Sequence, residues 1–243
     1  DPYREAEQNR WTSPYLDAIA ADFRDDLDLH VAISRLKLRF MASPEALIHG
    51  DLHTGSIMVT ESETRVIDPE FAFYGPMGFD IGAVLANLVM AYFASSGHER
   101  ALGERRAFEA WVLDIVEGVW NEFSGKFLEL WRMEAAGDAY PARLFAGEEG
   151  SARLETERRA YMARLFSDTV GFAAAKIIRR IFGLAHNIDF EWIEDPRSRA
   201  VCEARSLRLA RAMMVDTASF PTIGSVTKAA RELRDWQPDL ARQ

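Results

Sequence analysis

Apolar residues recur at three- and four-residue spacing along most of the chain, and this pattern predicts a mainly helical protein. Ser13-Pro14 and Asp195-Pro196 are helix-start signals, because a capping side chain precedes a proline that suits the first turn. The expected helices cover residues 14–40 with a break near Leu29, then 105–123, 127–136, 158–184, 196–215 and a short stretch after 223. Residues 137–151, with scattered Gly, Pro and Asp, are expected to form a loop.

A different pattern interrupts these helices early in the chain. Short apolar runs at residues 47–48, 57–59 and 65–67 predict strands, with polar residues 61–63 as a hairpin turn. The helix that begins near Phe79 has almost no polar face and is expected to lie at the centre of the core. The fold class is therefore α+β, mainly α-helical, with a small β-hairpin.

Composition narrows the functional classes. The net charge of −9 and pI near 5.2 argue against a nucleic-acid partner, which would require a basic face. The uncharged run 81–98 contains Asn, Ser and Gly and is a poor membrane span, so no membrane partner is expected. Cys202 is the single cysteine, which excludes an intrachain disulfide and, with no secretion signal at the start, favours a cytoplasmic location.

Two acidic motifs flank the predicted hairpin. His49-Gly50-Asp51 precedes it, and Asp68-Pro69-Glu70 follows it, so that Asp51 and Asp68 stand 17 residues apart. In phosphoryl-transfer enzymes an Asp in a rigid loop orients the acceptor hydroxyl, while carboxylates after the next strand hold Mg²⁺ on the phosphates. A hairpin folded between the motifs brings both carboxylates to one cleft mouth.

Each motif also has an ordinary structural explanation. A lone His-Gly-Asp is common in turns, and Asp-Pro-Glu is common where a strand ends, because the residue before proline is extended. Their order, their strand context and the buried helix that follows favour the functional interpretation.

The motifs resemble the catalytic loop and metal motif of the aminoglycoside phosphotransferase and choline kinase superfamily, which has a protein-kinase-like fold. The longer strings HGDLHTGSIMV, VIDPEFAFYGPMGFDIGAVLAN and RRIFGLAHNIDFEWIEDPRSR resemble the branch that phosphorylates 5-methylthioribose in methionine salvage. The resemblance implies ATP and Mg²⁺ as cofactors. It also implies that the chain, residues 1–243, is a C-terminal catalytic lobe.

Residue by residue, the resemblance implies that Asp51 is the catalytic residue beside the sugar 1-hydroxyl, and that Asp68 and Glu70 are Mg²⁺ ligands. The broader superfamily has Asn where this sequence has Ser56, and Phe-Gly where it has Pro69-Glu70. A serine hydroxyl is a weaker ligand than an amide oxygen, so Glu70 is expected to supply what Ser56 does not.

Arg179 and Arg180 are the substrate-binding pair that the resemblance implies, together with Asp51. Helical periodicity alone puts both arginines on the flanks of an apolar stripe, where a solvated helix edge is the simpler interpretation. Asp80 is expected to bond back to the catalytic loop from the start of its helix. The roles of His53, Ser56 and His186 are left open.

A kinase of this class needs a second lobe, and no Gly-rich loop or strand lysine precedes the helical first 45 residues. We therefore expect an N-terminal nucleotide-binding lobe outside this chain, and little or no activity from this lobe alone. Two alternatives are a related kinase for aminoglycoside, choline or homoserine, and a non-catalytic helical binding module. The oligomeric state, a homodimer included, is left open.

Overall fold

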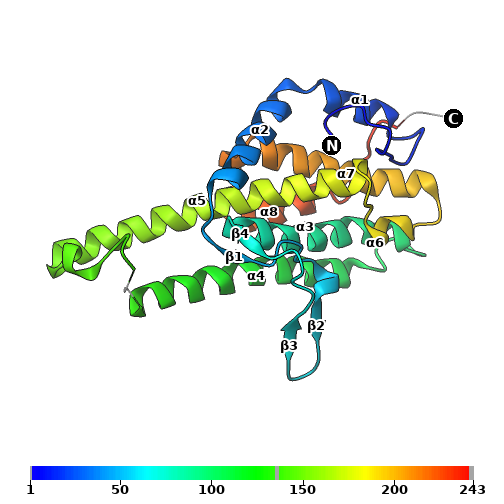
Figure 1. Cartoon of the computed structure of the whole chain (residues 1–243). Helices are drawn as coiled ribbons and strands as arrows, with labels where there is room; N and C mark the ends of the chain where they lie inside the picture. The colour runs from blue at the N-terminus through cyan, green and yellow to red at the C-terminus, as the bar shows by residue number, and fades with distance from the viewer. Residues whose placement is uncertain (1, 135–136, 241–243) are drawn as a thin grey trace.

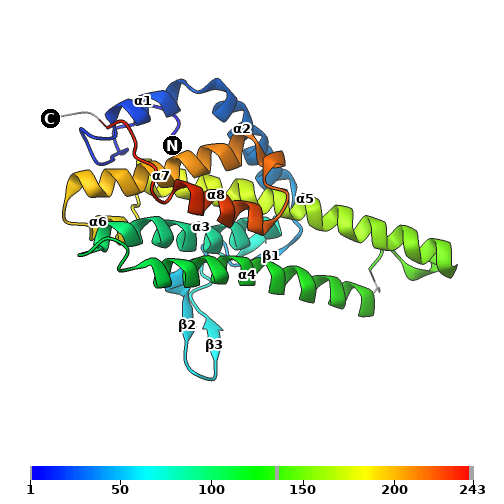
Figure 2. The same ribbon diagram turned by 180° about the vertical axis from the view of Figure 1, so that it is seen from behind.

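The computed structural model describes residues 2–134 and 137–240. Long helices lie side by side and form the body, and two pairs of very short strands sit against one flank (Figures 1 and 2). The expected fold class, α+β and mainly helical, is confirmed. The four long helices of the body are α3 (Met77–Ser95), α4 (Arg106–Met133), α5 (Gly147–Phe182) and α7 (Pro196–Val215).

The N-terminal helical region is divided, as predicted. Helix α1 (Asp17–Asp25) ends at Asp26, whose side chain accepts a hydrogen bond from Leu29 N and caps α2 (Leu27–Ala42). The break falls at Asp26 because an aspartate that caps one helix adopts an extended backbone and cannot continue the helix before it. Helix α1 begins at Asp17, three residues later than the Ser13-Pro14 signal predicts.

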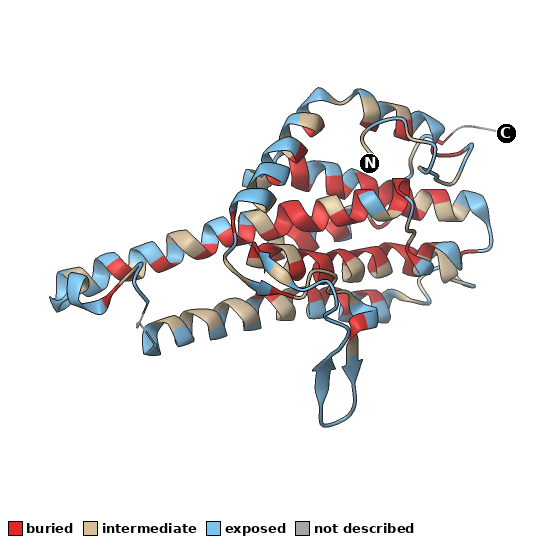
Figure 3. Ribbon diagram, in the orientation of Figure 1, coloured by how far each residue is buried: buried red, intermediate tan, exposed pale blue. Residues whose placement is uncertain are grey.

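Helix α3 is the central helix of the core, as expected from its lack of a polar face. It packs against both α5 and α4, and Figure 3 shows its buried surface. The segment Met77–His98 is long and apolar enough to cross a membrane, yet 67% of its most apolar window is buried inside the protein. Its apolar side chains therefore pack mainly against neighbouring helices, as those of a core helix do.

Helix α3 approaches α5 at the distance of backbone contact. A Cβ atom at Gly82 would lie 2.6 Å from the carbonyl oxygen of Thr169 and 2.8 Å from Ala173 N. Only a residue without a side chain allows this spacing.

Two antiparallel strand pairs carry the segments of interest. Strand β2 (Ile57–Val59) pairs with β3 (Thr64–Val66) in the predicted hairpin, which stands out from the body (Figure 1). Strand β1 (Ala46–Ile48) pairs with β4 (Phe73–Gly75), and Ile48 lies opposite Phe73. Strand β4 was not predicted from the sequence, because it depends on a partner strand, β1, that is distant in the chain.

Helices α4 and α5 extend beyond the body as a long helical hairpin (Figure 1). The prediction of two helices at 105–123 and 127–136 is wrong, because α4 is continuous through Gly125. Its aromatic side chains continue past that glycine, and Phe127 stacks on Tyr161 of α5 with ring centroids 6.0 Å apart. The expected loop at 137–151 is also too long, since α5 begins at Gly147.

The C-terminal part closes the bundle. After α6 (Ile188–Glu191) and α7, helix α8 (Ile223–Leu233) leads to Arg234, whose buried guanidinium pairs with Glu109 and Glu99. Leu240 is buried in the core cluster, so the end of the described chain packs against the bundle. Four single turns of 3-10 helix complete the elements: Thr54–Ser56, Ser96–His98, Ala142–Phe145 and Thr217–Ser219.

The close contact of α3 with α5 makes a testable prediction. We expect Gly82→Val to lower the free energy of unfolding by about 3 kcal/mol, because the added side chain must push two backbones apart. Urea unfolding measures the change. Gly118→Ala in α4 is the control, since a Cβ there meets nothing within 4 Å and is expected to raise stability by about 1 kcal/mol. Equal effects of the two substitutions would contradict the proposed contact.

Candidate active site

The two acidic motifs come together because β1 pairs with β4. Residues 49–51 leave the end of β1 at Ile48, and residues 68–72 enter β4 at the opposite residue, Phe73. The His49 Nε2–H group donates to the Ile67 carbonyl at 2.8 Å, directly before Asp68. Gly50 has φ +85°, and a Cβ atom there would lie 2.2 Å from the Phe71 carbonyl oxygen. The His-Gly-Asp loop therefore lies directly on the segment that carries Asp68 and Glu70.

Asp80 fixes this loop from the first turn of α3, as the sequence led us to expect. Its carboxylate is buried and accepts hydrogen bonds from His49 N at 2.5 Å and Gly50 N at 3.1 Å. Both backbone N–H groups donate to the same carboxylate, and hydrogen bonds to a charged acceptor are stronger than those between neutral groups. The loop is thus attached to the core helix and its position is set by the packing of α3.

The Asp51 carboxylate meets a residue that the sequence analysis missed. Lys176, from the C-terminal part of α5, donates to Asp51 Oδ1 at 3.0 Å, and its side chain is only 6% exposed. His53 Nε2 lies 3.8 Å from Asp51 Oδ2, and Arg180 adds a second positive charge nearby. A charged residue inside the apolar run FAAAKII was the available signal, because a lysine there needs a buried partner.

The ion pair sets the charge of both groups. Partial burial acts to raise the pKa of Asp51, but the hydrogen bond and charge of Lys176, with His53 and Arg180, outweigh it and hold the pKa below its ordinary value. Burial lowers the pKa of Lys176, the neighbouring arginines add to this effect, and the hydrogen bond to Asp51 opposes it. Asp51 is therefore an ionised carboxylate and a weak base at neutral pH.

Asp68 and Glu70 lie on the surface beside the loop. Asp68 has a left-handed backbone, φ +66°, which is uncommon for a residue other than glycine. Within residues 2–134 and 137–240 neither carboxylate has an ion-pair partner, and no three His, Cys, Asp or Glu residues form a cluster that could hold a metal by themselves. The fold therefore places Asp51 beside the segment that carries Asp68 and Glu70. Among the described residues, however, these three carboxylates do not form a metal site made of protein ligands alone.

This donor set is compatible with Mg²⁺ in one specific way. Mg²⁺ keeps several of its waters and is usually bound by one or two carboxylates together with substrate phosphates. Two exposed carboxylates without competing cations fit that requirement, whereas a site made of protein ligands alone would need more groups.

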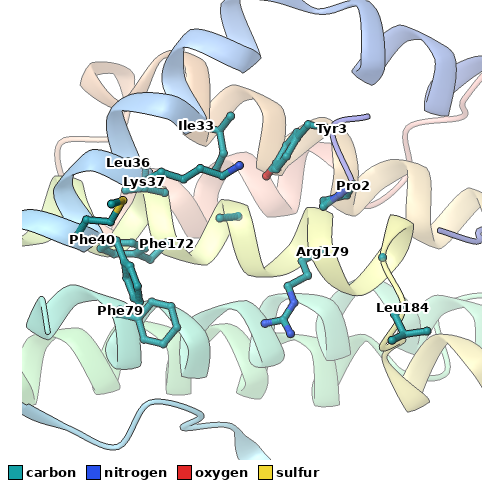
Figure 4. Close-up of a pocket in the computed structure, with 13 residues that line it drawn as sticks. Pro2, Tyr3, Ile33, Leu36, Lys37, Phe40, Phe79, Phe172, Arg179 and Leu184 are labelled. Atoms are coloured by element: carbon teal, nitrogen blue, oxygen red, sulfur yellow. The ribbon is translucent and has the colours of Figure 1, made fainter. Parts of the chain in front are cut away.

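Arg179 and Arg180 project from α5 in different directions. Arg180 is half-buried near Asp51, and burial followed by the charge of Arg179 lowers the pKa of its guanidinium. Arg179 lies at the edge of a cavity of about 610 Å³ (Figure 4). The cavity walls are mainly apolar and include Ile33, Leu36, Phe40, Phe79 and Phe172. Cationic groups and an apolar cavity therefore adjoin the same stretch of α5.

Of the residues left open, Ser56 and His53 belong to the loop. The buried Ser56 hydroxyl lies 3.4 Å from the Asp51 carbonyl oxygen and 3.4 Å from His53 Nε2, so it supports the loop. His186 lies 4.0 Å from Glu191 and has a buried Nε2 atom without a hydrogen-bond partner in the described chain.

Comparison with known proteins agrees with this geometry. Residues 1–114 match the model of the phosphotransferase enzyme family. Relatives named methylthioribose kinase 1 from Oryza sativa subsp. japonica and methylthioribose kinase from Escherichia coli O45:K1 are 49% and 38% identical over 93% and 95% of this chain. The chain is therefore similar to phosphotransferases of this family. It spans about half the length of the curated relatives it matches, 52% and 55% respectively.

The anchoring role of Asp80 can be tested directly. Asp80→Ala removes both acceptors of the loop amides, so we expect faster hydrogen exchange at His49 and Gly50 and a loss of about 2 kcal/mol of stability. Exchange mass spectrometry of peptides across residues 47–53, with urea unfolding, measures both. Asp114→Ala, an exposed aspartate of α4, is the control. Unchanged hydrogen exchange of residues 47–53 in Asp80→Ala would show that Asp80 does not hold the loop.

Proposed function

We propose that the protein transfers the γ-phosphoryl group of ATP to the 1-hydroxyl of 5-methylthioribose, with this chain as its catalytic lobe. The observation that carries the proposal is Asp51: an ionised carboxylate on a loop held by Asp80 and Lys176, directly beside the Asp68–Glu70 segment. The names of the relatives supply the acceptor, since they are methylthioribose kinases.

The reaction requires an oriented acceptor. Asp51 accepts a hydrogen bond from the 1-hydroxyl group and turns its oxygen toward the γ-phosphorus. The bond between that oxygen and phosphorus forms as the bond from phosphorus to the ADP oxygen breaks, and the hydroxyl proton passes to Asp51 and then to solvent. Such transfers depend mainly on positioning and electrostatics, so a weakly basic aspartate is sufficient.

Asp68 and Glu70 would hold Mg²⁺ against the phosphates of ATP. The ion supplies positive charge where negative charge develops on the phosphoryl oxygens. The exposure of both carboxylates and their lack of a cationic partner in the described chain support this role.

The sugar would bind along α5. Guanidinium groups at Arg179 and Arg180 suit hydroxyl and phosphate oxygens, and the apolar cavity beside Arg179 suits an acceptor with an apolar substituent. A cationic acceptor such as choline or an aminoglycoside would meet three positive side chains there, Lys176 included. This arrangement favours a neutral sugar.

An N-terminal nucleotide-binding lobe would cover the strands. The ribbon of the protruding hairpin is coloured as exposed in Figure 3, and its exposed residues include the apolar Met58, Val59 and Val66. Exposed apolar patches of this kind commonly mark an interface. ATP would then bind between that lobe and the hairpin, in a cytoplasmic enzyme.

The function is tested by ADP release from the intact gene product that contains this chain. We expect 5-methylthioribose to give ADP well above ribose, choline and homoserine, and Asp51→Asn to lower kcat by about 10²- to 10⁴-fold. Asp114→Asn is the control for a surface aspartate. If methylthioribose gave no more ADP than the buffer blank, the acceptor assignment would be wrong. A non-catalytic binding module would be indifferent to Asp51→Asn.

Removal of a metal ligand has a separate signature. We expect Asp68→Asn and Glu70→Gln each to raise the Mg²⁺ concentration needed for half-maximal activity by about tenfold or more, because each removes a charged oxygen ligand. Titration of ADP release with Mg²⁺ at saturating ATP measures this value. Glu63→Gln, on the exposed hairpin turn, is the matched control. A lower kcat with an unchanged Mg²⁺ requirement would count against metal binding.

A further inference from the structure

Lys176 is an unusual residue for its position. It lies in the most buried part of α5, between Ala175 and Ile177, and its side chain is almost fully enclosed. Enclosing an ammonium group is unfavourable unless an anionic partner compensates the lost hydration. Within residues 172–178 of α5, Lys176 is the one charged residue, and it lies where Asp51 approaches the helix.

The pairing fixes one oxygen of the carboxylate. Lys176 Nζ donates to Asp51 Oδ1 at 3.0 Å, whereas Oδ2 has no hydrogen bond in the described chain and His53 is 3.8 Å from it. The Asp51 side chain is 36% exposed, so the second oxygen is reachable from outside. Oδ2 is therefore the atom left to accept the hydrogen bond of an acceptor hydroxyl.

The ammonium group also has unused capacity. It carries three N–H donors, and Asp51 is its one hydrogen-bond partner within residues 2–134 and 137–240. The remaining donors have no hydrogen-bond acceptor within those residues. Because α5 is a long helix packed in backbone contact with α3, the position of Nζ is set by the core and not by a surface loop.

We propose that Lys176 is a positioning residue for phosphoryl transfer: it holds Asp51 by Oδ1 so that Oδ2 faces the acceptor hydroxyl. This inference rests on the proposed function. The other charged groups that face Asp51 are His53 on its own loop and Arg180 on α5, with Arg179 acting on Lys176. None of them has a hydrogen bond to the carboxylate, so Lys176 alone determines its orientation.

A double-mutant cycle on the intact gene product tests the proposal. We expect Lys176→Met to lower kcat by about 100-fold with little change in KM, because a misplaced carboxylate costs about that factor. In the Asp51→Asn background the same substitution should lower kcat no further, since Lys176 acts through Asp51. Lys228→Met, which removes an exposed lysine paired with Glu232, is the control and should leave kcat unchanged. Thermal unfolding checks the fold, and Lys176→Gln replaces Lys176→Met if that variant is unfolded.

A second readout does not depend on activity. Carboxyl NMR of ¹³C-labelled aspartate, assigned with Asp51→Asn, should show the Asp51 titration moving to higher pH in Lys176→Met, because a compensating cation is lost while His53 and Arg180 remain. Multiplicative kcat losses in the cycle, or an unmoved titration, would overturn the positioning role. A wild-type protein that released no ADP with any acceptor would refute the proposed function and the role in transfer, while the titration would still report whether the two groups are coupled.

Discussion

The backbone contact between α3 and α5 is the constraint on which the site depends. Asp80 lies between Gly78 and Gly82 on α3, two glycines that lie against the backbone of α5, and Lys176 lies one turn beyond Ala173 on the other side of the contact. One helix therefore holds the backbone of the loop at residues 49–51, and the other holds the Asp51 carboxylate. Neither helix can shift without separating two closely packed backbones. The loop at residues 49–51, which is bonded to both helices, is therefore held as rigidly as the core.

The charges of the site are divided between two elements. Helix α5 contributes cations, Lys176, Arg179 and Arg180, while the segment before β4 contributes the carboxylates Asp68 and Glu70. Asp51 lies between the two sets and is paired with the first. This separation suits a reaction in which one side receives a neutral acceptor and the other side receives a metal ion with phosphates, since the cations do not neutralise the metal ligands directly.

Local signals predicted the parts of the fold that depend on neighbouring residues. The helical period, the β2–β3 hairpin and a break in the first helical region were visible, because each is decided by capping, turn chemistry or side-chain periodicity within about ten residues. The break was expected near Leu29 and lies at Asp26. Strand β4 and the continuity of α4 through Gly125 were missed. Their stability comes from a distant partner: β4 needs β1, and α4 runs through Gly125 because its aromatic side chains pack on Tyr161.

The sequence by itself determined the order of the two acidic motifs, the likeness to phosphotransferases and the expectation that Asp80 bonds to the loop. Only the tertiary structure decided which side chain faces Asp51. Lys176 is 125 residues away in the chain. The family resemblance drew attention to the arginine pair near it, and helical periodicity left this lysine unremarked. The physical reason is that a periodic pattern reports which face of a helix is buried, whereas a contact between two charged groups depends on how distant segments are packed together.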